Sequence, residues 1–177
     1  MICAQIKGTR TFEYRSASPL FRPTDSPRYS PSGLRDTMKP MFETFDHTAD
    51  LGLRIRAGDL NTLFSEAGLA LASILVEDPT SVRPVRRVQV DLPADEVEYL
   101  LYDWLRAILY HFESDRLLVA RCEVRVSPTA GLQAVLEGET FDPARHELSH
   151  EIKAITYHDL RVEETEDGWL AEVIVDI

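Results

Sequence analysis

The strongest constraint on the fold is the order in which the spacing of apolar residues changes along the chain. Two segments, residues 60–76 and 93–112, place apolar residues three and four positions apart, which is the period of an amphipathic helix. The other patterned segments alternate apolar and polar residues, as a strand with one face in water does. Most of them follow the second helix. This order predicts an α+β domain in which two amphipathic helices pack on one face of a mainly antiparallel sheet.

Local residues support both predicted helices. Asp59 follows Gly58 and stands where its side chain can cap the first helix. Pro93 and several acidic residues open the second helix, where the helix dipole favours negative charge. The apolar stripe of the second helix contains Leu101, Trp104 and other large residues at helical spacing. We therefore predict that this stripe, with Trp104 in it, is buried.

The alternating segments are short and are separated by residues that favour turns. One such segment, residues 51–57, precedes the first helix, and residues 85–92 lie between the helices. The chain then alternates repeatedly after Glu113, with turn residues such as Asp142 and Gly168 between the segments. We predict antiparallel strands within residues 117–127, 132–141, 150–158, 160–165 and 169–177.

Charge divides the chain near residue 40. Residues 1–40 carry seven Lys or Arg and three acidic residues, a net charge of +4, whereas residues 41–177 carry twelve and twenty-seven, a net charge of −15. The first part is also rich in Pro and Ser and cannot bury enough surface to offset the entropy of ordering. We predict a disordered basic extension over 1–40 and one domain over 41–177. The extension is a nonessential tail, a segment upstream of a start at Met38 or Met41, or an RNA-binding arm, and we assign it no site.

Composition and motifs argue against several classes of protein. An apolar content of 44% is typical of a globular protein, and no apolar run approaches the ~20 residues that span a bilayer. The opening residues lack the apolar region of a secretory signal, which predicts a cytoplasmic protein. Cys3 and Cys122 form neither a disulfide framework nor a CxxC site. The phosphate-binding, dinucleotide-binding, HExxH and GxSxG signatures are absent from the sequence.

Carboxylates at the ends of predicted strands are the remaining candidates for chemistry. Asp46 and Asp50 flank His47 in the octet FDHTADLG, and Asp176 precedes Ile177 at the end of the sequence. Clustered oxygens suit a hard cation such as calcium or magnesium, and the lack of thiolates disfavours structural zinc. Each residue also has a structural alternative: Asp50 as a cap or turn residue, His47 as a structural imidazole and Asp176 as a solvated charge.

Four blocks of the sequence resemble the archease family in order and spacing. They are FDHTADLGLRIRAGDLNTLFSEAGLAL, LLYDWLRAILYHFE, EIKAITYHDLRV and WLAEVIVDI. The resemblance covers residues 41–177 and is specific because several separated blocks agree. It implies a small cytoplasmic protein that is not itself an enzyme but activates the tRNA-splicing RNA ligase, which joins RNA ends with GTP and a divalent metal. It further implies promotion of ligase guanylylation and multiple turnover, and a broader choice of nucleotide.

The resemblance also implies a bound divalent cation, usually calcium, with magnesium and manganese as alternatives. Its ligands fall on Asp50, Asp176 and Ile177, with His47 beside the metal and Lys153 on a neighbouring strand. A lysine there neutralises excess negative charge or contacts a phosphate, unless it is a solvated strand residue.

The acidity of residues 41–177 favours a protein partner over direct binding of RNA, because nucleic-acid affinity rests on Lys and Arg. We therefore expect the protein to act on RNA only indirectly, through the ligase. The acidic residues of the two helices are a candidate docking face or a solvated helix surface. Two other functions remain open: a metal-dependent phosphoester hydrolase that uses Asp50 and Asp176 with His47 as base, and a chaperone-like binding module.

Overall fold

A computed structural model describes residues 41–47, 50–127 and 129–177, so the predicted extension over 1–40 lies outside the described residues. The described residues form seven strands, two α-helices and one short 3-10 helix, η1. In chain order these elements are β1 (Met41–His47), β2 (Asp50–Ala57), α1 (Leu60–Leu75), η1 (Pro79–Ser81), β3 (Arg86–Leu92), α2 (Val97–Asp115), β4 (Leu117–Ser127), β5 (Gly131–Thr140), β6 (Ala154–Thr165) and β7 (Gly168–Asp176).

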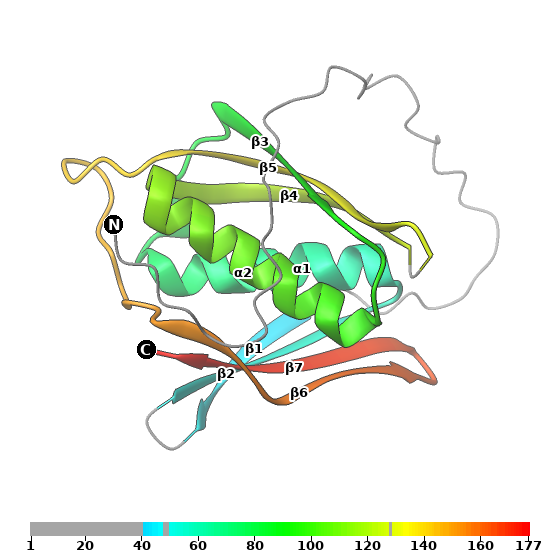
Figure 1. The fold of residues 1–177 in the computed structure, drawn as a ribbon. Coiled ribbons are helices and arrows are strands. Elements are labelled where there is room, and N and C mark those ends of the chain that lie inside the picture. Colours follow the sequence, from blue (N-terminus) through cyan, green and yellow to red (C-terminus); the bar gives the residue numbers. More distant parts are fainter. Residues whose placement is uncertain (1–40, 48–49, 128) are drawn as a thin grey trace, which may run out of the picture. The chain divides into compact units, whose positions relative to one another are not determined.

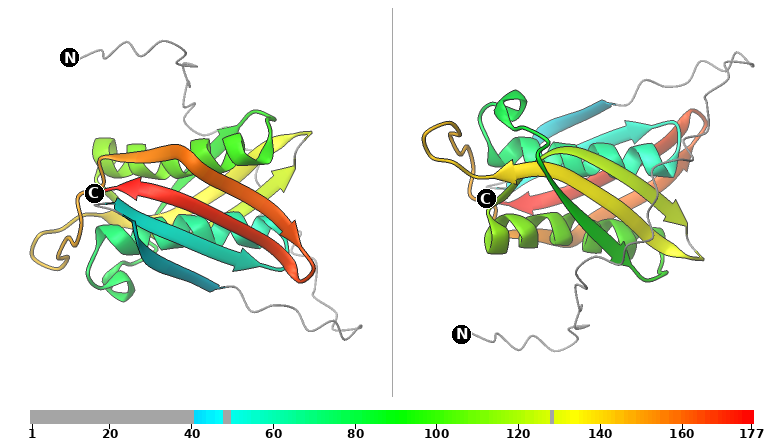
Figure 2. Two further views of the ribbon diagram at one scale, coloured as in Figure 1. Left: turned by 90° about the horizontal axis from the view of Figure 1, so that it is seen from below. Right: turned by 90° about the horizontal axis from the view of Figure 1, so that it is seen from above.

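The strands form two antiparallel sheets, and the two helices lie between them (Figure 1). The four-stranded sheet has the order β1-β2-β7-β6 and the three-stranded sheet the order β3-β5-β4, as the two views of Figure 2 show from below and above. Helix α1 packs against β2 and β4, and α2 packs against β6 and β4. The α+β class predicted from the sequence is confirmed.

The strands divide into two sheets where the sequence analysis expects one, and the reason lies in α1. Three consecutive residues of this helix, Ala70, Leu71 and Ala72, are buried, which cannot happen when only one stripe of a helix is covered. A helix that is apolar around most of its circumference needs cover from more than one side. The second sheet supplies that cover, and the domain has three layers.

The helix ends follow their local chemistry. Asp59 Oδ1 accepts a hydrogen bond from the amide N–H of Thr62 at 3.0 Å, so the predicted cap of α1 is confirmed. Helix α2 begins at Val97, after Pro93 rather than at it. It ends at Asp115. The cap residue Arg116 has a left-handed φ of 52° and donates its amide N–H to the carbonyl of His111.

The core lies between the sheets and is centred on the two helices. Leu101, Trp104 and Leu105 of α2 are fully buried, which confirms the predicted stripe. The indole Nε1–H of Trp104 donates to the carbonyl oxygen of Phe64 on α1 at 2.9 Å. This bond satisfies the one polar atom of the indole and ties the helices to each other.

Two strands differ from the sequence analysis. Strand β1 is not predicted there, although it forms one edge of the four-stranded sheet by pairing with β2. Strand β6 begins at Ala154, so residues 150–153 of the predicted segment 150–158 lie outside it. The rest of that segment and the segment 160–165 belong to this one strand, whose register against β7 shifts between Thr156 and Arg161. Asp159 within this bulge has a left-handed φ of 59°. The bulge hides the continuity of β6 because it interrupts the apolar–polar alternation.

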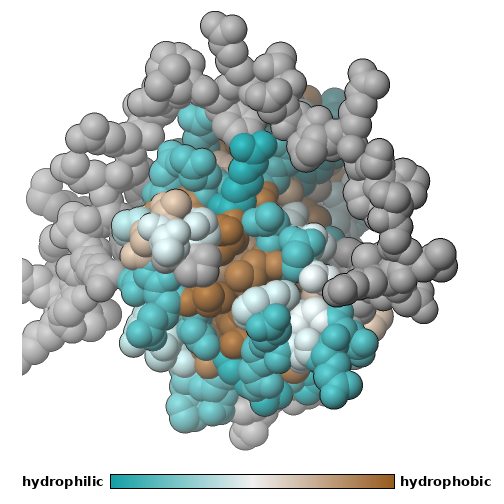
Figure 3. Space-filling view, turned by 90° about the vertical axis from the view of Figure 1, so that its right-hand side faces the viewer, coloured by the Kyte–Doolittle hydropathy of each residue, from teal (hydrophilic) through white to brown (hydrophobic). Residues whose placement is uncertain are grey.

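The surface is mixed in polarity. Figure 3 views the molecule from the right-hand side of Figure 1 and shows apolar residues at the centre of this end, with hydrophilic residues around them. Within the described ranges, no helix combines the length and the apolar character that crossing a membrane requires.

Candidate functional site

The sheet register places the two predicted carboxylate ligands next to each other. Leu51 of β2 pairs with Val175 of β7, so the next position in this register sets Asp50 opposite Asp176. Asp50 is the first residue of β2, and Asp176 is the last residue of β7. Directly opposed residues of an antiparallel pair have Cβ atoms about 4.5–5.5 Å apart. Residues 126 positions apart in the sequence therefore come together at one end of the sheet.

Strand alternation determines which way these carboxylates face. Leu53 of β2 and Val173 of β7 are fully buried against the helices. Asp50 and Asp176 occupy positions of the opposite parity and therefore belong to the outer face of the four-stranded sheet. Both side chains are placed where a cation or a partner can approach from solvent.

Lys153 directly precedes β6 and does not lie on a strand as the sequence analysis expects, but it still reaches this group. Its amide N–H donates to the main-chain oxygen of Asp176 at 2.9 Å, and its Nζ donates to the main-chain oxygen of Ile177 at 2.8 Å. The same Nζ lies 3.9 Å from Asp176 Oδ1. The structure thus brings Lys153, Asp176 and Ile177 together. The lysine side chain is 61% exposed, so water screens its ion pair with Asp176.

Only the backbone of His47 can be placed. It pairs with Asp50 in the β1–β2 ladder, which puts the residue at the same end of the sheet. The His47 side chain and residues 48–49 lie outside the described residues. The predicted place of the imidazole beside a metal stays a prediction.

The donor chemistry of this end fits a hard divalent cation. Two carboxylates and a main-chain oxygen are the ligand types that calcium and magnesium take, and water would have to complete either coordination shell. The Lys153 ammonium between Ile177 and Asp176 shows that positive charge is already stabilised at this end. Within the described part of the chain, no three His, Cys, Asp or Glu side chains converge in the manner of a closed metal site.

A ladder of ion pairs crosses the same outer face. Arg54 bonds Glu43 at 3.0 Å on one side and Glu172 on the other, and Arg161 donates to Glu172 at 3.0 Å. Burial raises the pKa of Glu172, but the hydrogen bonds and charges of Arg54 and Arg161 outweigh it and hold that pKa below its usual value. The four residues lie on four neighbouring strands: Glu43 on β1, Arg54 on β2, Glu172 on β7 and Arg161 on β6. The ladder links all four strands, and its arginines are engaged by carboxylates.

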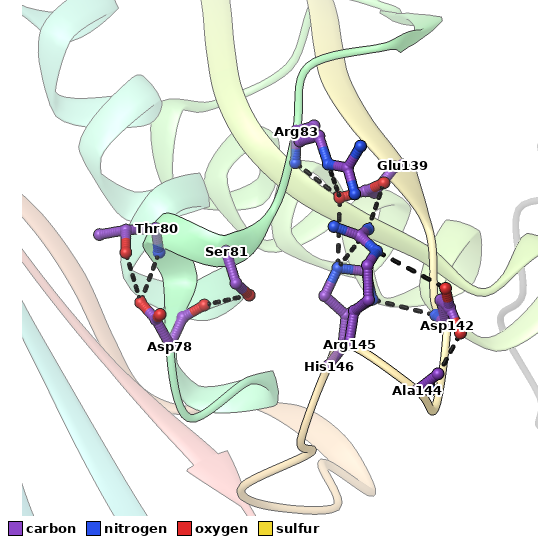
Figure 4. A network of polar contacts seen from close by, with 9 residues as sticks. All are labelled: Asp78, Thr80, Ser81, Arg83, Glu139, Asp142, Ala144, Arg145 and His146. Atoms are coloured by element: carbon purple, nitrogen blue, oxygen red, sulfur yellow. Dashed lines mark hydrogen bonds and ion pairs between the residues drawn. The ribbon is translucent and has the colours of Figure 1, made fainter.

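A second polar network holds the connection between β5 and β6 (Figure 4). Glu139 accepts hydrogen bonds from the amide N–H of Arg83 at 2.7 Å and contacts Arg145 Nη2 at 2.6 Å. His146 Nε2 lies 3.2 Å from the same carboxylate. The hydrogen bonds to Glu139, with that of Arg145 the strongest, lower its pKa to about 2.

Both ring nitrogens of His146 are in contact with polar groups of this network. The amide N–H of Asp142 donates to Nδ1 at 3.0 Å, and Nε2 lies 3.0 Å from Arg145 Nη2 and 3.2 Å from Glu139 Oε1. Figure 4 also shows Asp78, which caps η1 by accepting from Thr80 at 3.0 Å. The His146 imidazole and the Asp78 carboxylate each accept a hydrogen bond from a backbone amide of their own loop. Their role is therefore to fix loop structure.

Acid should weaken the Glu139 network. The pKa of Glu139 is about 2 in the folded protein against 4.5 for the ordinary group, so its contribution to stability is present above about pH 4.5 and is lost as pH falls towards 2. Glu139→Gln removes this titration. We expect the melting temperature of the wild type to fall more steeply between pH 5 and pH 2.5 than that of the variant. Parallel curves in calorimetry would contradict this assignment.

Comparison with known proteins agrees with this architecture. The model of the archease protein family matches residues 42–177. The archease of Pyrococcus furiosus is 34% identical over 143 residues, which covers 77% of this chain and 98% of the relative. The archease of Methanopyrus kandleri is 35% identical over 139 residues, which covers 77% of this chain and 99% of the relative. The solution structure of Methanobacterium thermoautotrophicum protein 1598 superimposes with a TM-score of 0.65 at 29% identity, over 77% of this chain and 98% of that one.

The fold therefore defines a small three-layer α+β protein whose four-stranded sheet gathers carboxylates at one end of its two inner strands. The chain belongs to the archease family, and the resemblance found in its sequence blocks is confirmed.

Proposed function

We propose that this protein is a metal-binding, non-enzymatic activator of the GTP-dependent tRNA-splicing RNA ligase. Membership of the archease family supports an association with that ligase. The observation that contributes most to the proposed mechanism is the register that sets Asp50 beside Asp176, next to Lys153 and Ile177. It supports the proposal because it brings oxygen donors of the type that a hard cation takes to one end of the outer face.

In this proposal the cation is held by Asp50, Asp176 and the main-chain oxygen of Ile177. Calcium suits an open, irregular set of oxygens best because it accepts six to eight ligands in flexible geometry, and magnesium or manganese are the alternatives. When bound, the cation supplies positive charge that can attract phosphate groups of the nucleotide in the ligase site. Lys153 offsets part of the carboxylate charge. The two hydrogen bonds that it donates, to the main-chain oxygens of Asp176 and Ile177, also hold this segment in place.

The proposed action is on the ligase and not on RNA. The net charge of −15 over residues 41–177 repels phosphates in free RNA, whereas it favours a basic channel in a protein partner. We infer that contact at the carboxylate end promotes guanylylation of the ligase, supports repeated turnover and widens its choice of nucleotide. We place this activity in the cytoplasm.

Ligation turnover by the purified ligase, with and without this protein, tests the proposal. We expect more product per ligase and faster formation of the guanylylated ligase when the protein and calcium are present, and a smaller effect after chelation. Equal turnover in both reactions would refute it. Hydrolysis of phosphate esters by the protein alone would favour the hydrolase, and suppression of aggregation in unrelated clients would favour the chaperone-like module.

A further inference from the structure

The exposed side of α2 carries aromatic residues where charged residues are usual. Tyr99, Tyr102 and Arg106 are spaced three and four residues apart, so they share one side of the helix. That side lies away from the buried stripe that contains Trp104. Tyr99 is 43% exposed. A solvent-facing helix surface is ordinarily polar, and large aromatic side chains on it call for an explanation.

Strand β6 adds a third tyrosine to this surface. The ring of Tyr157 stacks on Tyr99 with the centroids 4.9 Å apart and an angle of 12° between the planes, and it meets Tyr102 edge-on at 5.7 Å. The guanidinium of Arg106 lies 5.4 Å from the centre of the Tyr102 ring. We call Tyr99, Tyr102, Arg106 and Tyr157 the tyrosine surface.

The bulge in β6 begins where this surface forms. Tyr157 directly follows Thr156, the last residue in register before the strand shifts against β7. Bulges re-aim side chains, and here the strand presents Tyr157 to α2 while its ring stays 44% exposed. The stack fixes the rings before any partner arrives, so binding costs little further side-chain entropy.

The surroundings of the Tyr157 hydroxyl disfavour its ionisation. A hydrogen bond with Tyr99, followed by burial and the nearby acidic residues Glu98 and Glu96, raises the pKa of Tyr157 to about 12. The same acidic residues give the border of the surface a negative potential.

Charge and composition together select the kind of partner. Tyrosine and arginine are the side chains that concentrate binding energy in protein interfaces. Acidic neighbours such as Glu96 and Glu98 disfavour the phosphates of RNA and favour lysine or arginine, which also bind to aromatic faces. This combination fits a basic protein surface.

The tyrosine surface is close to the proposed cation end. Ala154 of β6 pairs with Asp176, and Tyr157 follows three residues later on the same strand, a distance of roughly 10 Å at the rise of a strand. Tyr157 faces α2, whereas Asp176 belongs to the outer face of the sheet, so an interface that includes both extends around the edge strand β6. A standard interface covers about 800 Å² on each partner, which is large enough for this.

We infer that the tyrosine surface is the docking site for a basic surface of the RNA ligase. This inference rests on the proposed function and separates two tasks within it. The tyrosines hold the partner, while the carboxylate end acts on its nucleotide site. Loss of the tyrosines should weaken binding to the ligase. Loss of the carboxylate end should lower the maximal stimulation of ligation.

The test compares Tyr99→Ala/Tyr157→Ala with Tyr110→Ala in the full-length protein. Tyr110 is a matched control because it is 46% exposed on the same helix, one turn beyond Arg106, but lies eleven residues, or about 16 Å, from Tyr99 and so outside the stacked tyrosines. The dissociation constant for the purified ligase is measured by titration calorimetry. We expect an increase of about tenfold or more for the double variant and less than about twofold for Tyr110→Ala. Saturating amounts of the double variant should restore full ligation turnover.

Other results overturn the inference in distinguishable ways. An unchanged dissociation constant in a double variant with normal circular dichroism refutes the docking site and leaves the proposed function intact. Equal losses in the double variant and Tyr110→Ala refute its location. A wild-type protein that neither binds nor stimulates the ligase refutes the proposed function and the named partner together. Self-association or RNA binding that only the double variant loses assigns the surface to a second copy or to RNA instead.

Discussion

Trp104→Ala is expected to lower the free energy of unfolding by about 3–5 kcal/mol, because the substitution leaves a large cavity in the core. Trp104 is fully buried, and its indole is bonded to the carbonyl of Phe64 at 2.9 Å. The indole also lies against Gly68 of α1, where a Cβ atom would come within 3.2 Å of the ring. The helices therefore approach closely around this side chain and cannot easily collapse into the space that it leaves.

Urea unfolding followed by circular dichroism measures this effect. Trp104→Phe keeps much of the apolar volume but removes the indole N–H that donates to the Phe64 carbonyl, so an intermediate loss is expected. Trp169→Ala in β7 is the control, since Trp169 is only half-buried and should cost less. Unchanged midpoints for Trp104→Ala would show that the indole does not hold α1 and α2 together.

The helices and most strands could be predicted because their signals are local. Asp59 caps α1 through an amide three residues away, and the apolar period of α2 lies within a single segment. The alternation around Leu53 likewise reports which side of β2 is buried. Such patterns depend on which side of an element meets the core and do not require knowledge of the neighbouring element.

The division into two sheets could not be predicted in this way because strand pairing is non-local. Arg54 bonds Glu43 eleven residues away and Glu172 118 residues away, and alternation gives no sign of either choice. Strand β1 lacks a clear period, and the bulge after Thr156 breaks the period of β6. In the sequence, the consecutive apolar residues Ala70, Leu71 and Ala72 were the available sign that α1 needed a second covering layer.

The candidate site, too, could be predicted only in part from local sequence patterns. The spacing of residues suggested oxygen ligands at strand ends, but the choice of Asp50, Asp176 and Ile177 came from the family resemblance. The structure adds the register that sets the two aspartates opposite each other, and it adds the hydrogen bond from Lys153 to Ile177. The tyrosine surface was missed. Tyr99, Tyr102 and Arg106 at helical spacing outside the apolar stripe were the sign, whereas the approach of Tyr157 depends on the bulge.

The second large effect tests whether Asp50 and Asp176 are metal ligands or structural residues. Asp50→Ala and Asp176→Ala are each expected to weaken calcium binding by at least about tenfold, because each removes a charged oxygen ligand. Both should also abolish ligase activation at saturating protein. The fold should remain intact, since both side chains belong to the outer face of the sheet and contribute little to the core.

Calcium titration calorimetry on the variants, with ligation turnover alongside, separates the two roles. Asp59→Ala is the matched control: it removes a carboxylate that caps α1, so it should cost about 0.5–2 kcal/mol of stability and leave calcium binding unchanged. Lys153→Gln removes a positive charge 3.9 Å from Asp176 Oδ1 and should tighten calcium binding, because a cation no longer competes with the ammonium group. If Asp50→Ala instead resembles Asp59→Ala, with lower stability but full calcium binding and full activation, Asp50 is a structural residue and the cation is held elsewhere.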